Sequence, residues 1–550
     1  MIIPLLVRRR GTILIDTFTG AGPLSGHSPD TGPSNFYSAS GVTWELDGAG
    51  NLINTPTLGS TLITDGSFAA TTKATAKTVV GITKANPGVV TFAAGHGYLN
   101  GHVIYFFGLT EMTELNGGYF KLRNNAGNTF ELSSQPIGTW DTASHDTSGY
   151  GSAETTGGAC VQRVTLTSWT VSNAEWAPGV NGSGSLTGTA DCSSVGGTNI
   201  SQSVLEIGRW YQSIYTLNRT SGSCYAQMGS LVLGTKSVDG TYTEYGIAEG
   251  STNFIIRALP LLGSISTVSV KKLTDSELSE RHDMGFSQGY FQQTLASIPV
   301  GALVGVDLLW NAAGTDGLRA YINRATGTGV LRAQIAGVWQ TALIDTAITY
   351  SAGKNLVVLF DGQYVYLFYN NALVGTRQDI SALTTITSNT YWGNFSTDSS
   401  TTISAVTAKP LSYGADLFDP GVYAIGIGGW VKYGNNTVTN DAGEIKITYV
   451  DSAPGAYLDL KDSKDLSADL VVGGIYCLEG TARVNEGSVN TAIYNGSQNV
   501  GTTTVTSLTP VRFRIFSIEK SLYGSQIILA GMGGTEIIWL GGNMTLRKVQ

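Results

Sequence analysis

The carboxylate side chains of this 550-residue chain show no spacing that predicts catalysis. Hydrolysis of a glycosidic bond needs two carboxyl groups held across a cleft, and the acidic residues here are dispersed. Segments typical of a nucleophile elbow or a phosphate-binding loop are missing too. We therefore expect no catalytic residues and no enzyme. The densest acidic group comprises Asp275, Glu277, Glu280 and Asp283. We interpret this group as the solvent-exposed face of a helix.

Histidine and cysteine side chains are equally scattered, so no metal site is predicted from them. The four cysteines form no CxxC pair and are expected to be free, buried thiols, with Cys192–Cys224 as the one pairing worth testing. Residues 47–51 (DGAGN) carry oxygen atoms that suit calcium, but a hairpin turn explains them equally well. We expect no cofactor and leave calcium open.

Aromatic side chains are the residues best suited to hold a ligand. An indole or phenol ring can stack on the C–H face of a sugar, while amide and carboxylate groups bind its hydroxyls. The alternative is that these rings fill a core or a subunit interface. The candidate glycan-binding residues are Trp310, Trp339, Tyr364, Tyr366, Tyr391 and Trp392.

The composition predicts an all-β protein made of several modules. Charged residues amount to 13%, against roughly 25% in typical soluble domains. Glycine, with 71 residues, suits the many tight turns that connect short strands rich in Val, Thr and Tyr. The length exceeds that of one ordinary domain. The formal net charge of −8 argues against a nucleic-acid partner.

An internal repeat relates residues 165–273 to residues 413–550. Gly208 and Tyr211 recur at the same spacing as Gly473 and Tyr476. Each copy opens with a tryptophan-containing strand and closes on a strand with a basic end. Because an equal register implies the same strand pairing, we predict one shared topology with Gly208 and Gly473 at equivalent positions.

These two segments resemble the jelly-roll carbohydrate-binding modules that accompany glycoside hydrolases and occur in phage tail proteins. The resemblance rests on the opening tryptophan strand, the G-x-x-Y strand and the closing SVKKL or TLRKV strand. It implies two jelly-roll-like sandwiches and is poorly specific for sugar binding. Trp210 and Trp430, which lie in repeated strands, are expected in the cores.

A third unit is predicted at 274–412. Residues 274–277 (TDSE) fit a capping box, which predicts a short linker helix there. Residues 364–369 (YVYLFY) are expected to form a strand, followed by a tight turn at Asn370 and Asn371 and a return strand at 372–375. This hairpin and the later YWGNF resemble laminin-G-like, concanavalin-type lectins, which implies a β-sandwich. One face of 364–369 is expected in the core, and the other is a candidate platform.

Two further segments precede the repeat. Residues 1–77 contain DTFTG and VTWELDGAGNLI, an opening that resembles phage tail-associated proteins with lectin-like folds. They are too short for a sandwich, so an arm and β anchor region is expected. Residues 78–164 contain HGYLNG, MTELNGGYF and NTFELSS, and resemble the small β module named after the first catalytic cysteine half-domain of ubiquitin-activating enzymes. This implies a small β-barrel-like spacer or interaction module without ubiquitin chemistry.

The extreme N-terminus is a candidate assembly anchor. Its apolar strip precedes three arginines, the reverse of a secretory signal peptide, and is too short to cross a bilayer. Burial of this apolar strip against a partner would anchor the chain. The alternative is that the arm adds an edge strand to its own first domain. The anchor residues are Ile2, Ile3, Leu5, Leu6, Arg8, Arg9 and Arg10.

Together these features and resemblances predict a structural component of a bacteriophage virion that is made in the host cytoplasm. A tail or tail-fibre-associated protein that displays lectin-like domains to host-surface glycans is preferred. Expected partners are other virion proteins, host polysaccharide and further copies of the chain in a homo-oligomer, without membrane insertion. A head-decorating or head-fibre protein and an oligomeric capsule-degrading glycosidase or lyase remain alternatives. A bacterial surface lectin is disfavoured by the missing signal segment.

Overall fold

The computed structural model describes residues 14–31, 43–69, 74–134, 144–163, 166–172, 175–181, 185–194, 196–274, 278–417, 430–432, 437–448, 456–460, 470–495, 499–520, 525–530, 537–541 and 544–550. These residues form β-strands joined by turns and short 3-10 segments, which confirms the predicted all-β class. Two compact units result: one contains residues 1–55, 276–299 and 303–550, and the other contains residues 56–275 and 300–302. Each unit is described by itself.

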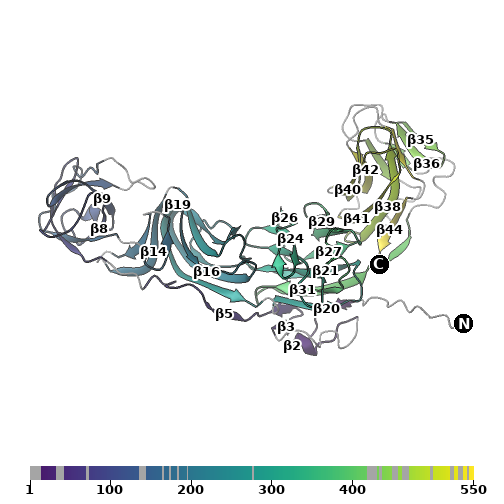
Figure 1. The fold of residues 1–550 in the computed structure, drawn as a ribbon, viewed down its shortest axis with the longest axis horizontal. Coiled ribbons are helices and arrows are strands. Elements are labelled where there is room, and N and C mark those ends of the chain that lie inside the picture. Colours follow the sequence, from purple (N-terminus) through teal and green to yellow (C-terminus); the bar gives the residue numbers. More distant parts are fainter. Residues whose placement is uncertain are drawn as a thin grey trace. The chain divides into compact units, whose positions relative to one another are not determined.

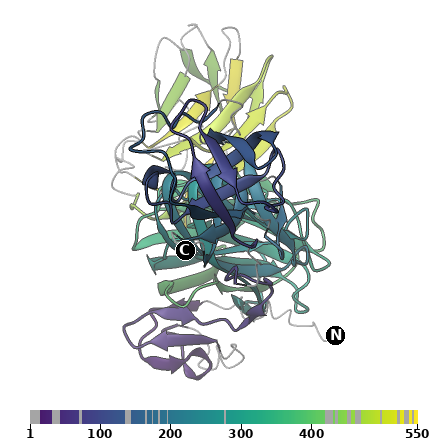
Figure 2. The same cartoon turned by 90° about the vertical axis from the view of Figure 1, so that its left-hand side faces the viewer.

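The second unit contains a closed barrel that confirms the predicted small β-barrel-like module (Figures 1 and 2, dark blue). Closure removes the exposed sheet edges. Alternate side chains such as Val79, Phe106 and Phe130 fill its interior. In barrel order the strands are β10 (Thr129–Ser134), β7 (Val89–Phe92), β6 (Lys77–Ile82), β11 (Gly158–Gln162), β8 (Val103–Phe107) and β9 (Tyr119–Ala126).

The rest of this unit is built around two long antiparallel strands, β16 (Trp210–Met228) and β19 (Asn253–Leu273) (Figure 1). Their register shifts at several points, and such β-bulges bend strands. Gly222 shows why a glycine is needed at one bend: its φ is +85° and an added Cβ would lie 1.5 Å from the Pro260 carbonyl oxygen. The remaining strands are β5 (Leu58–Thr61), β12 (Thr170–Val171), β13 (Trp176–Val180), β14 (Leu186–Ser194), β15 (Thr198–Ser203), β17 (Leu231–Val232) and β18 (Gly240–Ile247).

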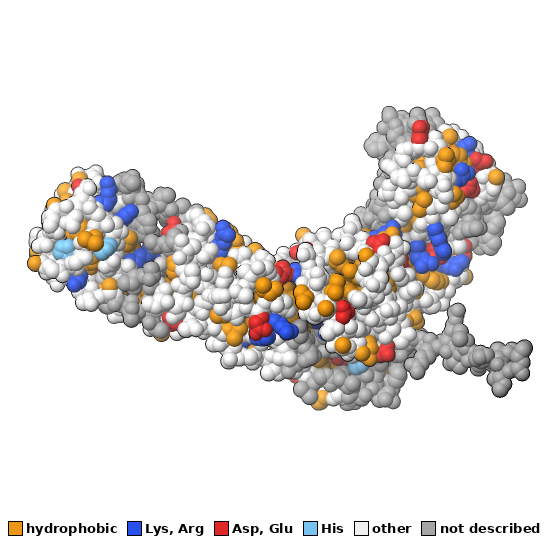
Figure 3. All heavy atoms as spheres, in the orientation of Figure 1, with side chains coloured by type: hydrophobic (Ala, Val, Ile, Leu, Met, Phe, Trp, Pro, Cys, Tyr) orange, Lys and Arg blue, Asp and Glu red, His pale blue; other side chains and the backbone are white. Residues whose placement is uncertain are grey.

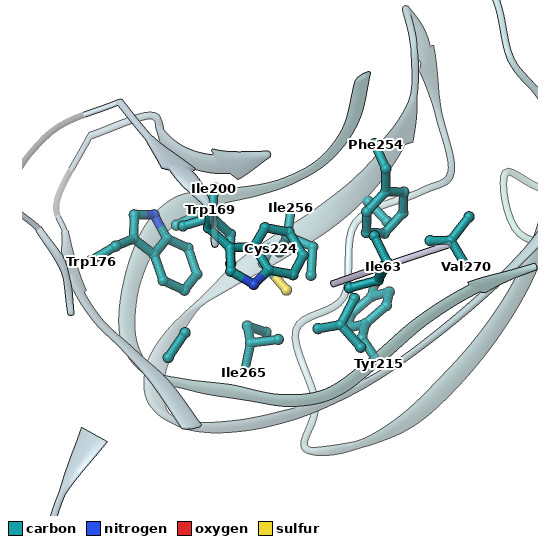
Figure 4. Packing of buried hydrophobic residues seen from close by; sticks show 14 of the residues in the cluster. Ile63, Trp169, Trp176, Ile200, Tyr215, Cys224, Phe254, Ile256, Ile265 and Val270 are labelled. Atoms are coloured by element: carbon teal, nitrogen blue, oxygen red, sulfur yellow. The ribbon is translucent and has the colours of Figure 1, made fainter. Parts of the chain in front are cut away.

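The core of this region combines residues that precede the barrel in the sequence with residues that follow it (Figure 4). Ile63, which precedes the barrel in the sequence, packs with Trp169, Trp176 and Cys224, which follow it. Burial of such apolar side chains is the main favourable term in folding. Cys192 is buried in the same cluster. All four cysteines lie in the described part of the chain, buried and free, as predicted.

The first unit contains a sandwich of two sheets that covers most of 279–410. One sheet has the order β2-β3-β4-β32-β21-β27-β28-β29, and the other has the order β20-β31-β22-β23-β24-β25. The strands are β20 (Ser279–Asp283), β21 (Gly289–Ser297), β22 (Leu303–Trp310), β23 (Gly317–Asn323), β24 (Thr328–Ile335), β25 (Val338–Trp339), β26 (Ile344–Ala347), β27 (Lys354–Phe360), β28 (Tyr364–Tyr369), β29 (Ala372–Leu373), β30 (Gln378–Asp379), β31 (Tyr391–Ser396) and β32 (Thr402–Pro410).

The N-terminal residues do not form a unit of their own. Strand β1 (Leu14–Asp16) pairs with β32, and β4 (Leu52–Asn54) joins the same sheet together with β3 (Trp44–Asp47) and β2 (Ala21–Pro23). Strand β5 instead pairs with β19. The segment predicted as 1–77 is therefore divided between the two units, because its apolar strands complete sheets whose other strands lie far away in sequence.

The linker helix predicted from the capping box is wrong for the residues after 278. Residues 279–283 form β20, which pairs with β31 from Ser279↔Phe395 to Asp283↔Tyr391. Glu280 is buried and Asp283 is exposed, so the acidic group is no solvated helix face. Tertiary pairing has overridden the local capping signal. Asp275 and Glu277 lie outside the described residues.

The predicted hairpin at 364–375 is confirmed. Strand β28 is followed by Asn370 (φ +49°) and Asn371 (φ +63°) and returns as β29. Two consecutive positive φ values are those of a type I′ turn, whose twist matches that of the flanking strands. Asparagine tolerates this conformation better than most residues.

The C-terminal module packs on the sandwich within the same unit. Tyr366 and Phe368 of β28 share a buried cluster with Cys477 and Phe516 of the module. The module has two sheets, ordered β33-β44-β38-β43-β36-β35 and β34-β37-β42-β39-β40. Its strands are β33 (Tyr413–Asp416), β34 (Trp430–Lys432), β35 (Thr437–Asp441), β36 (Glu444–Thr448), β37 (Ala456–Leu460), β38 (Ile475–Val484), β39 (Val489–Asn495), β40 (Asn499–Val505), β41 (Val511–Ile518), β42 (Ser525–Ala530), β43 (Ile537–Leu540) and β44 (Thr545–Val549).

The predicted equivalence of the repeated segments is confirmed by strand register. Tyr211 faces Lys272 of the closing strand, and Tyr476 faces Lys548 of its own closing strand. Gly208 and Gly473 both precede these strands with positive φ, +81° and +83°. In each copy the tyrosine hydroxyl also accepts the backbone N–H five residues earlier, at 2.8 Å in the first copy and 2.7 Å in the second.

This shared hydrogen bond gives a first prediction. Tyr211→Phe and Tyr476→Phe should each destabilise their own module by about 1 kcal/mol, because a partly buried hydrogen bond to a backbone N–H is lost. Hydrogen exchange of the Glu206 and Val471 amides should accelerate in the corresponding variant only. Tyr391→Phe serves as the matched control. Unchanged exchange in both variants would mean that the bond does not hold the repeated turn.

The candidate anchor residues Ile2, Ile3, Leu5, Leu6, Arg8, Arg9 and Arg10 lie outside the described residues, so the anchor remains a prediction. The described part of the chain contains no helix of the length and apolar character needed to span a membrane.

Candidate functional site

The structure places the six predicted aromatic residues in different environments. Tyr366, Trp310 and Trp392 are 0% exposed, and Trp339 is 8% exposed. Tyr364 and Tyr391 are only half-buried. Since a ring must present a free face to stack on a sugar, the four buried residues belong to the protein interior. Tyr364 alone lines a pocket among those described below.

The buried rings have identifiable structural roles. The Trp310 indole N–H donates to the Leu318 carbonyl oxygen at 2.7 Å. Tyr366 packs edge-on against Phe516 of the C-terminal module, with ring centroids 5.6 Å apart. The face of β28 that was a candidate platform is therefore covered by that module.

A pocket of about 450 Å³ lies where the C-terminal module meets the edge of the sandwich. This volume falls within the roughly 300–1,000 Å³ typical of small-molecule sites. Lys and Arg side chains gather in this part of the unit (Figure 3, blue). The lining residues are Gln288, Asp361, Gly362, Gln363, Tyr364, Arg377, Thr503, Arg512, Phe513 and Arg514.

Arg377 fixes one wall of this pocket. Its guanidinium lies over the Tyr364 ring, 4.0 Å from the centroid, a favourable cation–π geometry. It also donates to the Arg514 carbonyl oxygen at 2.8 Å and to the Thr503 hydroxyl at 2.7 Å. These contacts connect the sandwich to the module, so Arg377 and Tyr364 are held rigidly at the pocket.

Arg512 and Arg514 form a second wall on β41. Arg514 is hydrogen-bonded to Glu479 through its Nε. Arg512 lies 3.6 Å from the same carboxylate, and 72% of its side chain is exposed. One carboxylate therefore serves two guanidinium groups, and Arg512 keeps most of its hydrogen-bonding capacity directed to solvent.

Asp361 is a buried carboxyl group among the lining residues of the pocket. Its Oδ1 accepts the backbone N–H groups of Gln363 at 2.9 Å and Tyr364 at 2.7 Å. Burial raises the pKa of this carboxyl group, while Arg514 and Arg377 oppose the rise. Asp361 thus shapes the loop that carries Tyr364 beside the pocket.

The arrangement suits a ligand that carries both an anionic group and hydroxyl groups. Three guanidinium groups line the pocket, while Asp361 lies in the lining and Glu479 pairs with two of them, so positive groups outnumber these carboxylates by one although the whole chain has a formal net charge of −8. Guanidinium groups bind carboxylate or sulfate oxygens in a bidentate manner. Gln288 and Gln363 add amide groups for hydroxyls. The sequence signal for this site was the alternation in Val511-Arg512-Phe513-Arg514, which places both arginines on one face of a strand.

The turn at 47–51, which was left open as a calcium site, has the contacts of a hairpin. Asp47 Oδ1 accepts the N–H of Ala49 at 2.7 Å and that of Asn51 at 3.0 Å. Its Oδ2 accepts the Asn51 amide at 2.8 Å. Among the described residues no group of three or more His, Cys, Asp and Glu side chains has the arrangement of a metal site.

Comparisons with known proteins give no family assignment. No family model matches the chain, and no curated protein matches it. Among solved structures, a carbohydrate-binding module, CBM66, from Bacillus subtilis aligns at 10% identity and a TM-score of 0.16 over 44% of this chain and 91% of that one. A triple jelly roll from an archaeal virus (9% identity) and a Sulfolobus turreted icosahedral virus structure (11%) each align at a TM-score of 0.16 over 70% of this chain and 91% of theirs. Similarities this low carry no inference about this chain.

Proposed function

We propose that this protein is a structural component of a bacteriophage virion, associated with the tail, and that it binds an anionic polysaccharide of the host surface. The observation that carries the binding role is the arginine-lined pocket between the lectin-like sandwich and the C-terminal module. The virion role is supported by the tandem β architecture and by the sequence resemblances to phage tail modules. Because those resemblances are to tail proteins, a tail location is preferred to head decoration.

Retention on immobilised polysaccharides tests the binding role. The full chain should bind uronate-containing polymers such as hyaluronan and alginate, and should not bind neutral dextran. Because the pocket offers charge at a partly exposed site, retention should fall as salt rises. Equal retention on dextran, or retention that is insensitive to salt, would contradict an anion-binding site.

Mass spectrometry and immunogold labelling of purified particles test the virion role. The chain should be present in particles, and the label should lie on the tail. Labelling of the head would overturn the tail assignment, and absence from the particles would overturn the virion role altogether.

The protein is further proposed to act without catalysis. Incubation with the polysaccharides that it retains should leave their length unchanged and release no reducing ends, because no pair of carboxyl groups is arranged across the pocket. Gel filtration and a reducing-end assay provide the measurement. Cleavage that a single Asp or Glu substitution abolishes would instead establish a depolymerase.

A further inference from the structure

A second polar pocket of about 430 Å³ lies within the other unit, between the barrel and the jelly roll. We propose that this pocket binds a neutral, hydroxyl-rich ligand of monosaccharide size, a saccharide ring being the chemical class that fits. The inference does not rest on the proposed function, since the two pockets share no residue. The lining residues are Gly117, Tyr119, Arg163, Asp191, Cys192, Ser193, Asn218, Arg219, Thr220, Asp239, Leu262, Gly263 and Ser264.

The jelly-roll wall of the pocket is shaped by irregular strand pairing. The register between β16 and β19 shifts between Arg219 and Ser221, at the pocket. Gly263 lies opposite Arg219, and an added Cβ there would be 2.4 Å from the Asn218 carbonyl oxygen. Bulges of this kind redirect side chains and occur often beside functional sites. Here the bulge lies next to Asn218 and Arg219, two polar residues that line the pocket.

The floor of the pocket combines Tyr119, Arg163 and Asp191. The Arg163 guanidinium lies 4.9 Å from the centre of the Tyr119 ring and donates to the Glu175 carbonyl oxygen at 2.6 Å. Asp191 accepts the Thr189 hydroxyl at 2.8 Å. Burial raises the pKa of Asp191, with Thr189 and Arg163 opposing the rise. The floor is therefore polar and poorly solvated.

The Tyr119 hydroxyl is the group that points to a ligand. It is buried and has no hydrogen-bond partner among the described residues. Buried polar atoms are nearly always hydrogen-bonded, so an exception calls for a missing partner. A ligand hydroxyl bound against the floor would supply one, with Asp191 as an acceptor for a second hydroxyl.

The charges of the pocket indicate that this ligand is neutral. Arg163 and Arg219 are matched by Asp191 and Asp239, and Arg219 Nε lies 3.8 Å from Asp239 Oδ1. An ionic ligand would bring a charge that these lining groups do not balance, which is costly where the floor is poorly solvated. Hydroxyl groups can donate to the carboxylates and accept from the guanidinium groups without adding charge. This balance of charge distinguishes the pocket from the arginine-rich pocket of the other unit.

Saturation-transfer NMR and calorimetry with defined monosaccharides test the proposal on the full chain. The probes are D-glucose, D-galactose and N-acetyl-D-glucosamine, with D-glucosamine and D-galactosamine as charged comparators whose positive charge does not suit the arginine-lined pocket of the other unit. At least one neutral sugar should bind more tightly than both charged ones. Asp191→Asn should weaken that binding about tenfold or more, and Tyr119→Phe about threefold to tenfold, as expected for lost hydrogen bonds.

Controls separate a binding role from a structural one. Tyr119→Phe removes a hydroxyl that lacks a partner, so the melting temperature of the unliganded protein should not fall. Tyr225→Phe, in the same unit but not among the lining residues of the pocket, should leave sugar binding unchanged. No binding of any neutral probe, tighter binding of a charged probe, or equal affinity in Asp191→Asn and the native chain would overturn the proposal.

Discussion

Replacing Asp307 by asparagine is expected to destabilise the lectin-like sandwich by about 3–5 kcal/mol, the range for removing one partner of a buried ion pair. Asp307 is 0% exposed and pairs with two arginines. Arg319 binds it through Nε at 2.7 Å and Nη2 at 3.0 Å, and Arg281 binds it through Nε at 2.7 Å. Asparagine keeps the shape but removes the negative charge that both guanidinium groups contact.

The exclusion of solvent from Arg319 increases this cost. Its guanidinium lies 4.0 Å from the Phe395 ring centre and 4.8 Å from that of Trp339. Solvent has no access to it, since Arg319 is 0% exposed. Burial by itself would raise the pKa of Asp307, but Arg319 and Arg281 outweigh burial and hold that pKa below its usual value. The stabilisation is therefore complete at neutral pH and is lost as pH falls below about 4, through the folded-state pKa.

Urea unfolding, with hydrogen exchange of the β22 and β23 amides as the local probe, measures this loss. Asp345→Asn, an exposed change of the same kind in the same unit, should shift stability by less than about 0.5 kcal/mol. In an Arg319→Met background, Asp307→Asn should cost less, because one of the stranded charges is gone. A loss below about 1 kcal/mol for Asp307→Asn would show that the pair contributes little.

Lys236→Met is expected to destabilise the jelly roll of the other unit by a similar amount, about 3–5 kcal/mol near pH 8. Lys236 Nζ lies 2.6 Å from Glu244 Oε1, and the two side chains are 7% and 1% exposed. The Tyr215 hydroxyl donates to the second Glu244 oxygen at 3.2 Å. Methionine preserves the length of the lysine side chain but leaves a carboxylate buried with a single neutral donor.

The pH dependence distinguishes this pair from a packing effect. Burial raises the pKa of Glu244 to about 7, with Lys236 opposing the rise. The raised pKa contributes stability that is present below the ordinary value of 4.5 and is lost as pH rises toward 7. In Lys236→Met the opposing charge is absent, so Glu244 protonates at still higher pH. The difference in unfolding free energy between native chain and variant should therefore shrink as pH falls from 8 to 5.

The matched control is Lys272→Met in the same jelly roll. Lys272 is also paired at 2.8 Å, with Glu206, but the two side chains are 39% and 64% exposed. Its loss should cost about 0–1 kcal/mol, without a pH trend in this range. Thermal unfolding at several pH values gives the measurement. A pH-independent loss for Lys236→Met would mean that its packing, and not its charge, matters.

Local sequence patterns predicted the local structure well. Two adjacent asparagines after six strand-forming residues were sufficient to predict the β28–β29 hairpin, because positive φ at both positions admits few other turns. The recurrence of Gly208 and Tyr211 as Gly473 and Tyr476 predicted a shared turn and pairing register, since a glycine with positive φ and a buried tyrosine each constrain the backbone.

Long-range contacts could not be predicted in the same way. Nothing near Leu14 indicates that it pairs with Ala408, and the capping box at 274–277 could not reveal that Ser279 would pair with Phe395. Both faces of residues 364–369 are apolar or aromatic, so the sequence left one of them as a candidate platform, but a module more than a hundred residues later covers Tyr366. Arg377 and Arg512 are brought to one pocket by that docking, so a search for aromatic residues found Tyr364 of this site but neither arginine.

The most direct test of the account is an equilibrium titration of the full chain with a hyaluronan oligosaccharide, comparing the native protein with Arg512→Gln. Arg512 has an exposed side chain and a single ion-pair contact within the described part of the chain, so its replacement should leave the fold intact. Affinity should fall about tenfold or more, as expected for the loss of one charge-assisted contact. Arg209→Gln, an exposed arginine of the other unit, should bind like the native chain. Equal affinity of Arg512→Gln and the native protein would contradict the assignment of this pocket as the anionic glycan site.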